Sequence, residues 1–153
     1  MRSFTLTKEQ VELAFDTAKK IQQSKAYTRG WSVDNIALGI LGEIAYGLMT
    51  GNPINTDVWN DKSDGGIDFP DGTDVKTISY QGPDPELKMS KIPVSPKATK
   101  LVLAVCDIKK NPNEVKLVGE ISMDNFKIKA SKRQYGDMSW FAVTSSELDK
   151  IYE

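Results

Sequence analysis

An apolar, helix-forming segment of the chain carries a single charged side chain. Residues 36–49 read IALGILGEIAYGLM, and Glu43 is the one carboxylate among them. With 3.6 residues per turn, Glu43 shares a helix face with Ile36, Ile40 and Gly47. A carboxylate is rarely buried unless a basic side chain or a cation compensates its charge. Glu43 therefore either reaches water at the rim of the helix or belongs to a charged site.

A second segment, GIDFPDGTDVK (residues 66–76), contains a Pro-Asp-Gly turn between two short strands. Pro presets φ for a type I turn, and Gly readily adopts the left-handed conformation that follows it. A two-residue loop would put Asp68 and Asp74 on opposite faces, whereas a three-residue loop with a Gly bulge sets them opposite each other. We expect the three-residue loop, because the other register pairs Pro70, which has no N–H to donate.

In the expected register, two carboxylates lie roughly 5 Å apart at Cβ, where like charges destabilise a sheet. Strand alternation places Lys76 on the same face as Asp74. Two acids and a lysine on one face favour a metal-binding site over a solvated hairpin with a surface ion pair. The apolar residues interleaved with them indicate a core sheet: Ile67, Phe69, Val75 and Ile78.

The composition excludes several other chemistries. The chain has no His and one Cys, so it has no Ser-His-Asp or Cys-His machinery and no zinc site of Cys and His ligands. It also lacks the GxxxxGK[ST] phosphate loop. Carboxylates and lysines remain, and they suit hard cations such as Mg²⁺.

Taken in order, these motifs resemble a known family. Gly42-Glu43 in a helix, Gly65–Asp68 at the start of a strand and Asp74–Lys76 in the next strand are similar to the PD-(D/E)XK nuclease superfamily. Ile67 departs from the pattern, since Pro often precedes the first Asp. The resemblance implies a restriction-endonuclease-like fold and a metal-dependent endonuclease that hydrolyses DNA.

The resemblance also implies roles for these residues. Asp68 and Asp74 would bind Mg²⁺, or Mn²⁺ in its place, beside the Val75 carbonyl, and Glu43 would contact the metal or its water. Lys76 would position the attacking water and stabilise negative charge. Weaker candidates for substrate binding are Arg29, Gln81, Lys88 and Lys91.

Helical and strand periodicities predict one α/β domain over residues 1–153, with a mixed central sheet flanked by helices. Helices are expected at residues 7–24, 32–50, 123–128 and 144–152. Strands are expected at residues 67–69, 73–80, 101–108, 115–122 and 140–143, with loops at 52–66 and 81–96.

Charge is unevenly distributed along a chain whose formal net charge is −1. Residues 88–133 hold 11 Lys and Arg against 4 Asp and Glu, and the remainder holds 9 against 17. This asymmetry is as typical of a solvated charged face as of a surface for a polyanion. With the motifs, it favours nucleic acid as partner, DNA over RNA.

Other functions remain open at this point. The alternatives are an RNA-directed nuclease of the same fold and a non-catalytic nucleic-acid-binding or interaction module, and a homodimer is compatible with either. No apolar run approaches the ~20 residues that span a bilayer, and the N-terminus lacks a signal-peptide core. We therefore expect no membrane association and a cytoplasmic, intracellular protein, such as an accessory nuclease of a phage, mobile element or repair pathway.

Overall fold

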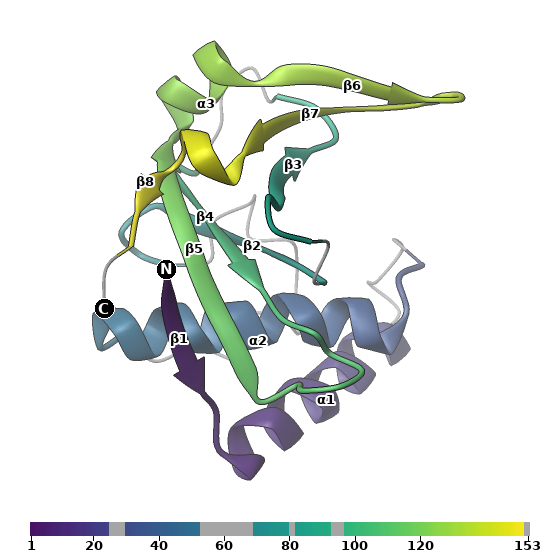
Figure 1. Cartoon of the computed structure of the whole chain (residues 1–153). Helices are drawn as coiled ribbons and strands as arrows, with labels where there is room; N and C mark the ends of the chain where they lie inside the picture. Colours follow the sequence, from purple (N-terminus) through teal and green to yellow (C-terminus); the bar gives the residue numbers. More distant parts are fainter. Residues whose placement is uncertain (25–29, 53–68, 80–81, 93–96, 152–153) are drawn as a thin grey trace.

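The computed structural model describes residues 1–24, 30–52, 69–79, 82–92 and 97–151, which form an α/β fold (Figure 1). Its elements are β1 (Arg2–Thr5), α1 (Lys8–Gln23), α2 (Val33–Thr50), β2 (Thr73–Ile78), β3 (Glu86–Met89), β4 (Lys100–Val105), β5 (Glu114–Ser122), α3 (Met123–Lys129), β6 (Ser131–Tyr135), β7 (Met138–Thr144), a 3₁₀ turn (Ser145–Glu147) and β8 (Asp149–Lys150). Two helices, a main sheet and a smaller second sheet follow one another from the bottom to the top of the view.

The main sheet has the spatial order β1-β5-β4-β2, with β8 also paired to β5. β2 and β4 run parallel, whereas the other neighbours run antiparallel. The predicted mixed sheet is confirmed. Within the described residues, β2 lies at its edge, so the strand with the Asp-x-Lys motif borders the sheet.

Both predicted N-terminal helices are confirmed, with the expected caps. The Thr7 hydroxyl accepts from the Gln10 N–H, and the Gln10 side chain accepts from the Thr7 N–H, which forms a capping box. Ser32 caps α2, and Gly51 ends it at a φ of 75°. Both helices share a core with one face of the main sheet, including Val75, Val102, Ala104, Val115 and Leu117.

The other face of the main sheet packs against the second sheet, whose order is β3-β7-β6, and against α3. Leu101 and Leu103 of β4 share this second core with Leu87 and Val143 of the second sheet. β4 is therefore buried on both faces, which explains its continuous apolar sequence. Among the described residues, no helix is long and apolar enough to cross a membrane.

One loop prediction was wrong. Residues 81–96 were expected to form a loop because of their prolines, but β3 lies inside this range and pairs with β7. Its four residues, ELKM, alternate polar and apolar, and Leu87 is fully buried. The prolines flank this short strand and do not interrupt it.

The predicted C-terminal helix was also wrong. The capping box between Thr144 and Glu147 forms, but it caps only a 3₁₀ turn. Leu148 is then buried close against Gly119, and residues 149–150 pair with β5 as β8. Burial of Leu148 and strand pairing outweigh continuation of the helix.

Candidate active site

The Pro-Asp-Gly hairpin adopts the three-residue loop expected from the sequence. The Gly72 N–H donates to the Phe69 carbonyl at 3.0 Å, and the Phe69 N–H donates to the Thr73 carbonyl at 3.2 Å. Gly72 has a φ of 86°, as its position after a type I turn requires. Asp68 precedes this hairpin and lies outside the described residues, so its position opposite Asp74 stays a prediction.

Side chains from two elements hold the turn. The Asp71 carboxylate accepts the Thr73 N–H at 2.9 Å and the Tyr46 hydroxyl at 2.8 Å. The Tyr46 hydroxyl also lies 3.0 Å from the Thr73 hydroxyl. Asp71 was interpreted as a turn residue alone, and Tyr46 was not singled out. A tyrosine within the apolar stretch of this helix is the available signal, since its buried hydroxyl needs a polar partner.

This network favours the ionised form of Asp71. Burial by itself opposes ionisation, but the hydrogen bonds from Thr73 and Tyr46 hold the pKa of Asp71 below its ordinary value. Lys100, at the start of β4, lies 5.6 Å from the centre of the Tyr46 ring. Burial opposes its charge too, but Tyr46, Glu120 and Asp71 raise the pKa of Lys100. The turn is therefore tied to α2 and lies close to a cation on β4.

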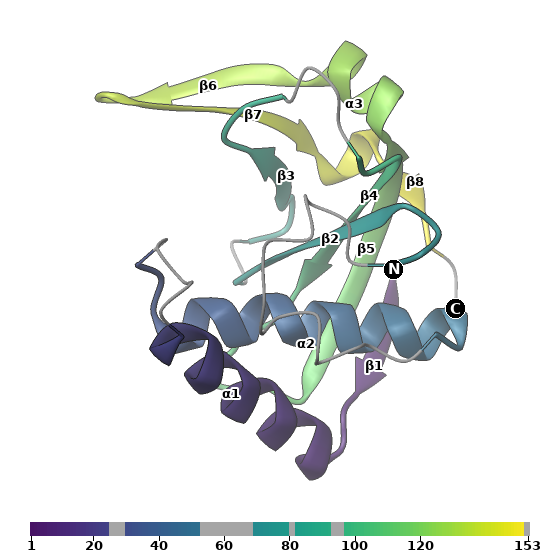
Figure 2. The same cartoon turned by 180° about the vertical axis from the view of Figure 1, so that it is seen from behind.

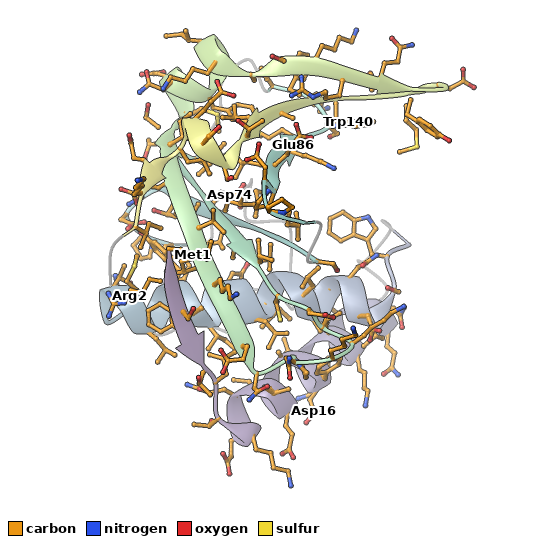
Figure 3. The ribbon with its side chains drawn as sticks, viewed as in Figure 1. Met1, Arg2, Asp16, Asp74, Glu86 and Trp140 are labelled. Carbon is orange, nitrogen blue, oxygen red and sulfur yellow. The ribbon has the colours of Figure 1, made fainter. Side chains whose placement is uncertain are left out.

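Asp74 and Lys76 form an ion pair on β2. Their carboxylate oxygen and ammonium nitrogen are 2.8 Å apart, and the side chains are 8% and 37% exposed, respectively. The predicted placement on one face is confirmed. Their β4 partners are Leu101 and Leu103, so the pair lies on the face of the main sheet that packs against the second sheet. Figure 3 shows Asp74 in the interior, between α2 and the second sheet.

Glu43 is buried, with 9% of its surface exposed. Its neighbour Gly42 brings α2 close to β2, because a Cβ at Gly42 would collide with the Thr77 hydroxyl. Further along α2, a Cβ at Gly47 would collide with the Asn52 carbonyl and contact the Phe69 ring. Glu43 lies on the same helix face as Gly47, so it occupies the side of α2 that is turned toward Phe69.

The described part of the site is therefore divided by the main sheet. The Asp74–Lys76 pair lies on one face of β2, and Glu43 comes from the helix that covers the other face. Because β2 is an edge strand within the described residues, groups from its two faces could share a cation only around that edge. Asp68 is the third carboxylate that the site hypothesis needs.

The chemistry of these groups fits a hard divalent cation. Glu43 and Asp74 supply oxygen donors from buried positions, as Mg²⁺ prefers. Cys106, the single thiol, is buried in the core, where desolvation raises its pKa to about 11, so it is no competing soft ligand. No cluster of three or more Asp, Glu, His or Cys occurs within the described residues. The predicted ligand set, which includes Asp68, extends beyond them.

The weaker substrate-binding candidates are dispersed. Arg29 and Gln81 lie outside the described residues. The Lys88 ammonium lies 5.4 Å from the centre of the Trp140 ring, on the face of the second sheet opposite buried Leu87. Lys91 is exposed just after β3. The described structure thus brings Asp74 and Lys76 together, whereas Lys88 lies beside Trp140 on the second sheet.

Comparison with known proteins identifies no relative of this chain. The chain matches no protein-family model, and neither a curated protein nor a solved structure is significantly similar to it. Its function is therefore proposed from the chemistry of its own residues.

Proposed function

We propose that this protein is a Mg²⁺-dependent nuclease that hydrolyses phosphodiester bonds of DNA. The observation that carries the proposal is the buried Asp74 carboxylate, 2.8 Å from the Lys76 ammonium on an edge strand. The buried Glu43 on the adjacent helix and the three-residue hairpin loop support it further. The order of these residues resembles the PD-(D/E)XK superfamily.

In this proposal, the carboxylates of Asp68 and Asp74 and the carbonyl of Val75 would hold the cation, and Glu43 would contact the metal or its water. Bound Mg²⁺ would supply a more acidic water and offset charge on the phosphate. The Lys76 ammonium, held in place by Asp74, would orient the attacking water and stabilise charge that develops on a phosphate oxygen. Lys76 then contributes more to the transition state than to substrate binding.

Several features support a catalytic function over a binding module of the same fold. A binding surface needs exposed cations, but it gains nothing from a buried Asp74 on β2 or a buried Glu43 on α2. Carboxylates near a phosphate backbone weaken binding unless a cation lies between them. The buried Glu43 and the buried Asp74, the latter paired with Lys76, therefore favour metal-assisted hydrolysis.

The direct experiment incubates the purified chain with supercoiled plasmid, linear duplex DNA, single-stranded DNA and RNA, each with Mg²⁺, Mn²⁺ or EDTA. We expect cleavage of DNA with either metal and none in EDTA. Nicking of the supercoiled plasmid identifies endonuclease action. Cleavage of RNA alone would replace the DNA assignment, and no cleavage of any substrate with either metal would refute the nuclease.

A further inference from the structure

The β6–β7 hairpin is a two-stranded arm that extends beyond the rest of the described chain, as both views show (Figures 1 and 2). Its ladder runs from Ser131 opposite Ala142 to Tyr135 opposite Met138. The connecting loop is Gly136-Asp137, with a φ of 59° at Gly136 and no positive φ at Asp137. A two-residue loop of this kind follows the natural twist of the strands, so the arm is regular up to its tip.

The tip of the arm presents two large side chains to solvent. Tyr135 is 80% exposed and Met138 is 68% exposed. They are directly opposite in the ladder, so they lie side by side on one face of the ribbon. Neither contributes to a hydrophobic core of the described chain. They form a solvent-exposed, largely apolar tip.

The first strand of the arm and the helix that leads into it are cationic. From Lys127 to Tyr135, the sequence KIKASKRQY has four cationic side chains and no acidic one. Arg133 is used locally, in an ion pair with Glu86 at 2.9 Å. Lys127, Lys129 and Lys132 are exposed and form no ion pair with any carboxylate of the described residues. Three cations are thus available to a partner.

We propose that this arm enters the major groove of duplex DNA and holds the substrate of the proposed nuclease. The B-DNA major groove admits a two-stranded β-ribbon. Its phosphate rims would contact Lys127, Lys129 and Lys132, and its floor would contact the apolar tip, Tyr135 and Met138. The inference depends on the proposed function for its substrate and adds the groove and the residues that hold it.

The same features argue against the other occupants. A second copy of the arm would bring like charges together, which disfavours pairing between arms. Duplex RNA has a deep, narrow major groove that side chains do not read, so a ribbon fits it poorly. Single strands have no groove to fill. Duplex DNA is the partner that fits both the shape and the charge.

DNA binding measured in EDTA tests the arm independently of catalysis, because the proposed cleavage needs Mg²⁺. Fluorescence anisotropy with a labelled 24-base-pair DNA duplex gives the affinity and its salt dependence. In the variant Lys127→Gln/Lys129→Gln/Lys132→Gln, we expect at least tenfold weaker binding and a log K against log salt slope that is shallower by about 2 to 3. In Tyr135→Ser/Met138→Ser, we expect about tenfold weaker binding with an unchanged slope.

The matched control is Lys8→Gln/Lys19→Gln/Lys20→Gln, which removes the same charge from exposed positions on α1. This helix lies at the end of the molecule opposite to the arm (Figure 1). We expect this control to bind nearly as tightly as the wild type. Equal losses in the α1 and arm variants would show that only net charge matters and would overturn the proposal. Equal affinity of the wild type for duplex RNA or single-stranded DNA would also overturn it.

The proposed function and this inference fail in different ways. If the wild type binds duplex DNA through the arm but cleaves nothing with Mg²⁺, the nuclease fails and the arm remains a DNA-binding element. If the wild type cleaves DNA but the arm variants bind and cleave normally, the arm inference alone fails. Dimerisation through the arm, detected by light scattering and lost in the tip variant, would contradict the inference as well.

Discussion

Asp74 has its counter-charge two residues away on its own strand, and that arrangement has a consequence for stability. Because the Asp74 carboxylate is buried and Lys76 is about one-third exposed, the pair lies between surface and buried ion pairs. We expect Lys76→Met to lower the free energy of unfolding by about 1–2 kcal/mol in EDTA. Mg²⁺ should then raise the melting temperature of this variant more than that of the wild type, because the cation replaces the lost charge.

The matched variant is Asp74→Asn, which removes a proposed ligand. Its melting temperature should respond little to Mg²⁺, whereas the wild type should respond clearly. Thermal melts in Mg²⁺ and in EDTA measure all three proteins. An equal Mg²⁺-induced shift in Asp74→Asn and the wild type would show that Asp74 is not a ligand.

Asp71 gives a pH-dependent prediction. Its pKa is lowered in the folded state, so its stabilising contribution is complete above the ordinary value of 3.8 and disappears as the pH falls through the lower folded value. We expect Asp71→Asn to be less stable than the wild type by about 1 kcal/mol at pH 7. The loss is small because Asp71 is exposed to solvent, which weakens its interactions. Urea unfolding at pH 7, 4.5 and 2.5 should show this difference narrowing at the lowest pH. A difference that grows toward pH 2.5 would refute the network.

At the level of elements, the contact between α2 and β2 depends on a glycine. A Cβ at Gly42 would collide with Thr77, whereas a Cβ at Gly39, one turn earlier, meets no neighbouring atom. We expect Gly42→Ala to destabilise the fold by about 1–3 kcal/mol through overpacking. Gly39→Ala should stabilise it by about 0.5–1 kcal/mol, because Ala is the better helix former.

This pair of variants also tests the position of Glu43. Gly42→Ala pushes α2 away from β2, so the proposed activity should fall by more than its stability loss explains, while Gly39→Ala should retain activity. Adding Thr77→Ala should recover part of the stability lost in Gly42→Ala. Chemical denaturation gives the three free energies, and equal effects at both glycines would mean that close packing at Gly42 is unimportant.

Elements with strong local signals could be predicted, and the others depend on long-range pairing. Thr7, Ser32 and Gly51 mark helix ends through their own hydrogen bonds or backbone conformation, so both long helices were found from the sequence. β3, β6 and β8 are short, and β6 is almost entirely exposed. These three strands form because β7 pairs with β3 and β6 and because β5 pairs with β8. Their own sequences do not indicate which strand they will pair with.

In the candidate site too, the features set by local backbone rules could be predicted, and the features set by long-range contacts could not. The hairpin loop and the shared face of Asp74 and Lys76 follow from local backbone rules, and both were predicted. The Tyr46–Asp71 hydrogen bond was not, because it joins residues 25 positions apart and depends on how α2 crosses β2. The separation of Glu43 from the pair by the main sheet likewise required the three-dimensional arrangement.

At the scale of the whole molecule, helices cover one face of the main sheet, and the second sheet with its arm covers the other (Figure 2). Of the proposed catalytic groups, Asp74 and Lys76 lie on β2, an edge strand within the described residues, and Glu43 lies on the helix that covers the other face of the sheet. The proposed binding arm extends from the second sheet. Binding and hydrolysis are thus assigned to separate elements, so variants of one should leave the other measurable.

The most direct test of the central claim is plasmid cleavage by the wild type and Lys76→Ala, purified in parallel, with Mg²⁺ and with EDTA. We expect the wild type to nick or linearise plasmid only with Mg²⁺. Lys76→Ala should cleave at least 100-fold more slowly, since an oriented charge at the transition state is lost, yet bind duplex DNA in EDTA within a few-fold of wild type. Lys109→Ala, an exposed lysine beyond β4, should cleave normally. Equal cleavage by Lys76→Ala and the wild type, or wild-type cleavage that persists in EDTA, would contradict the account.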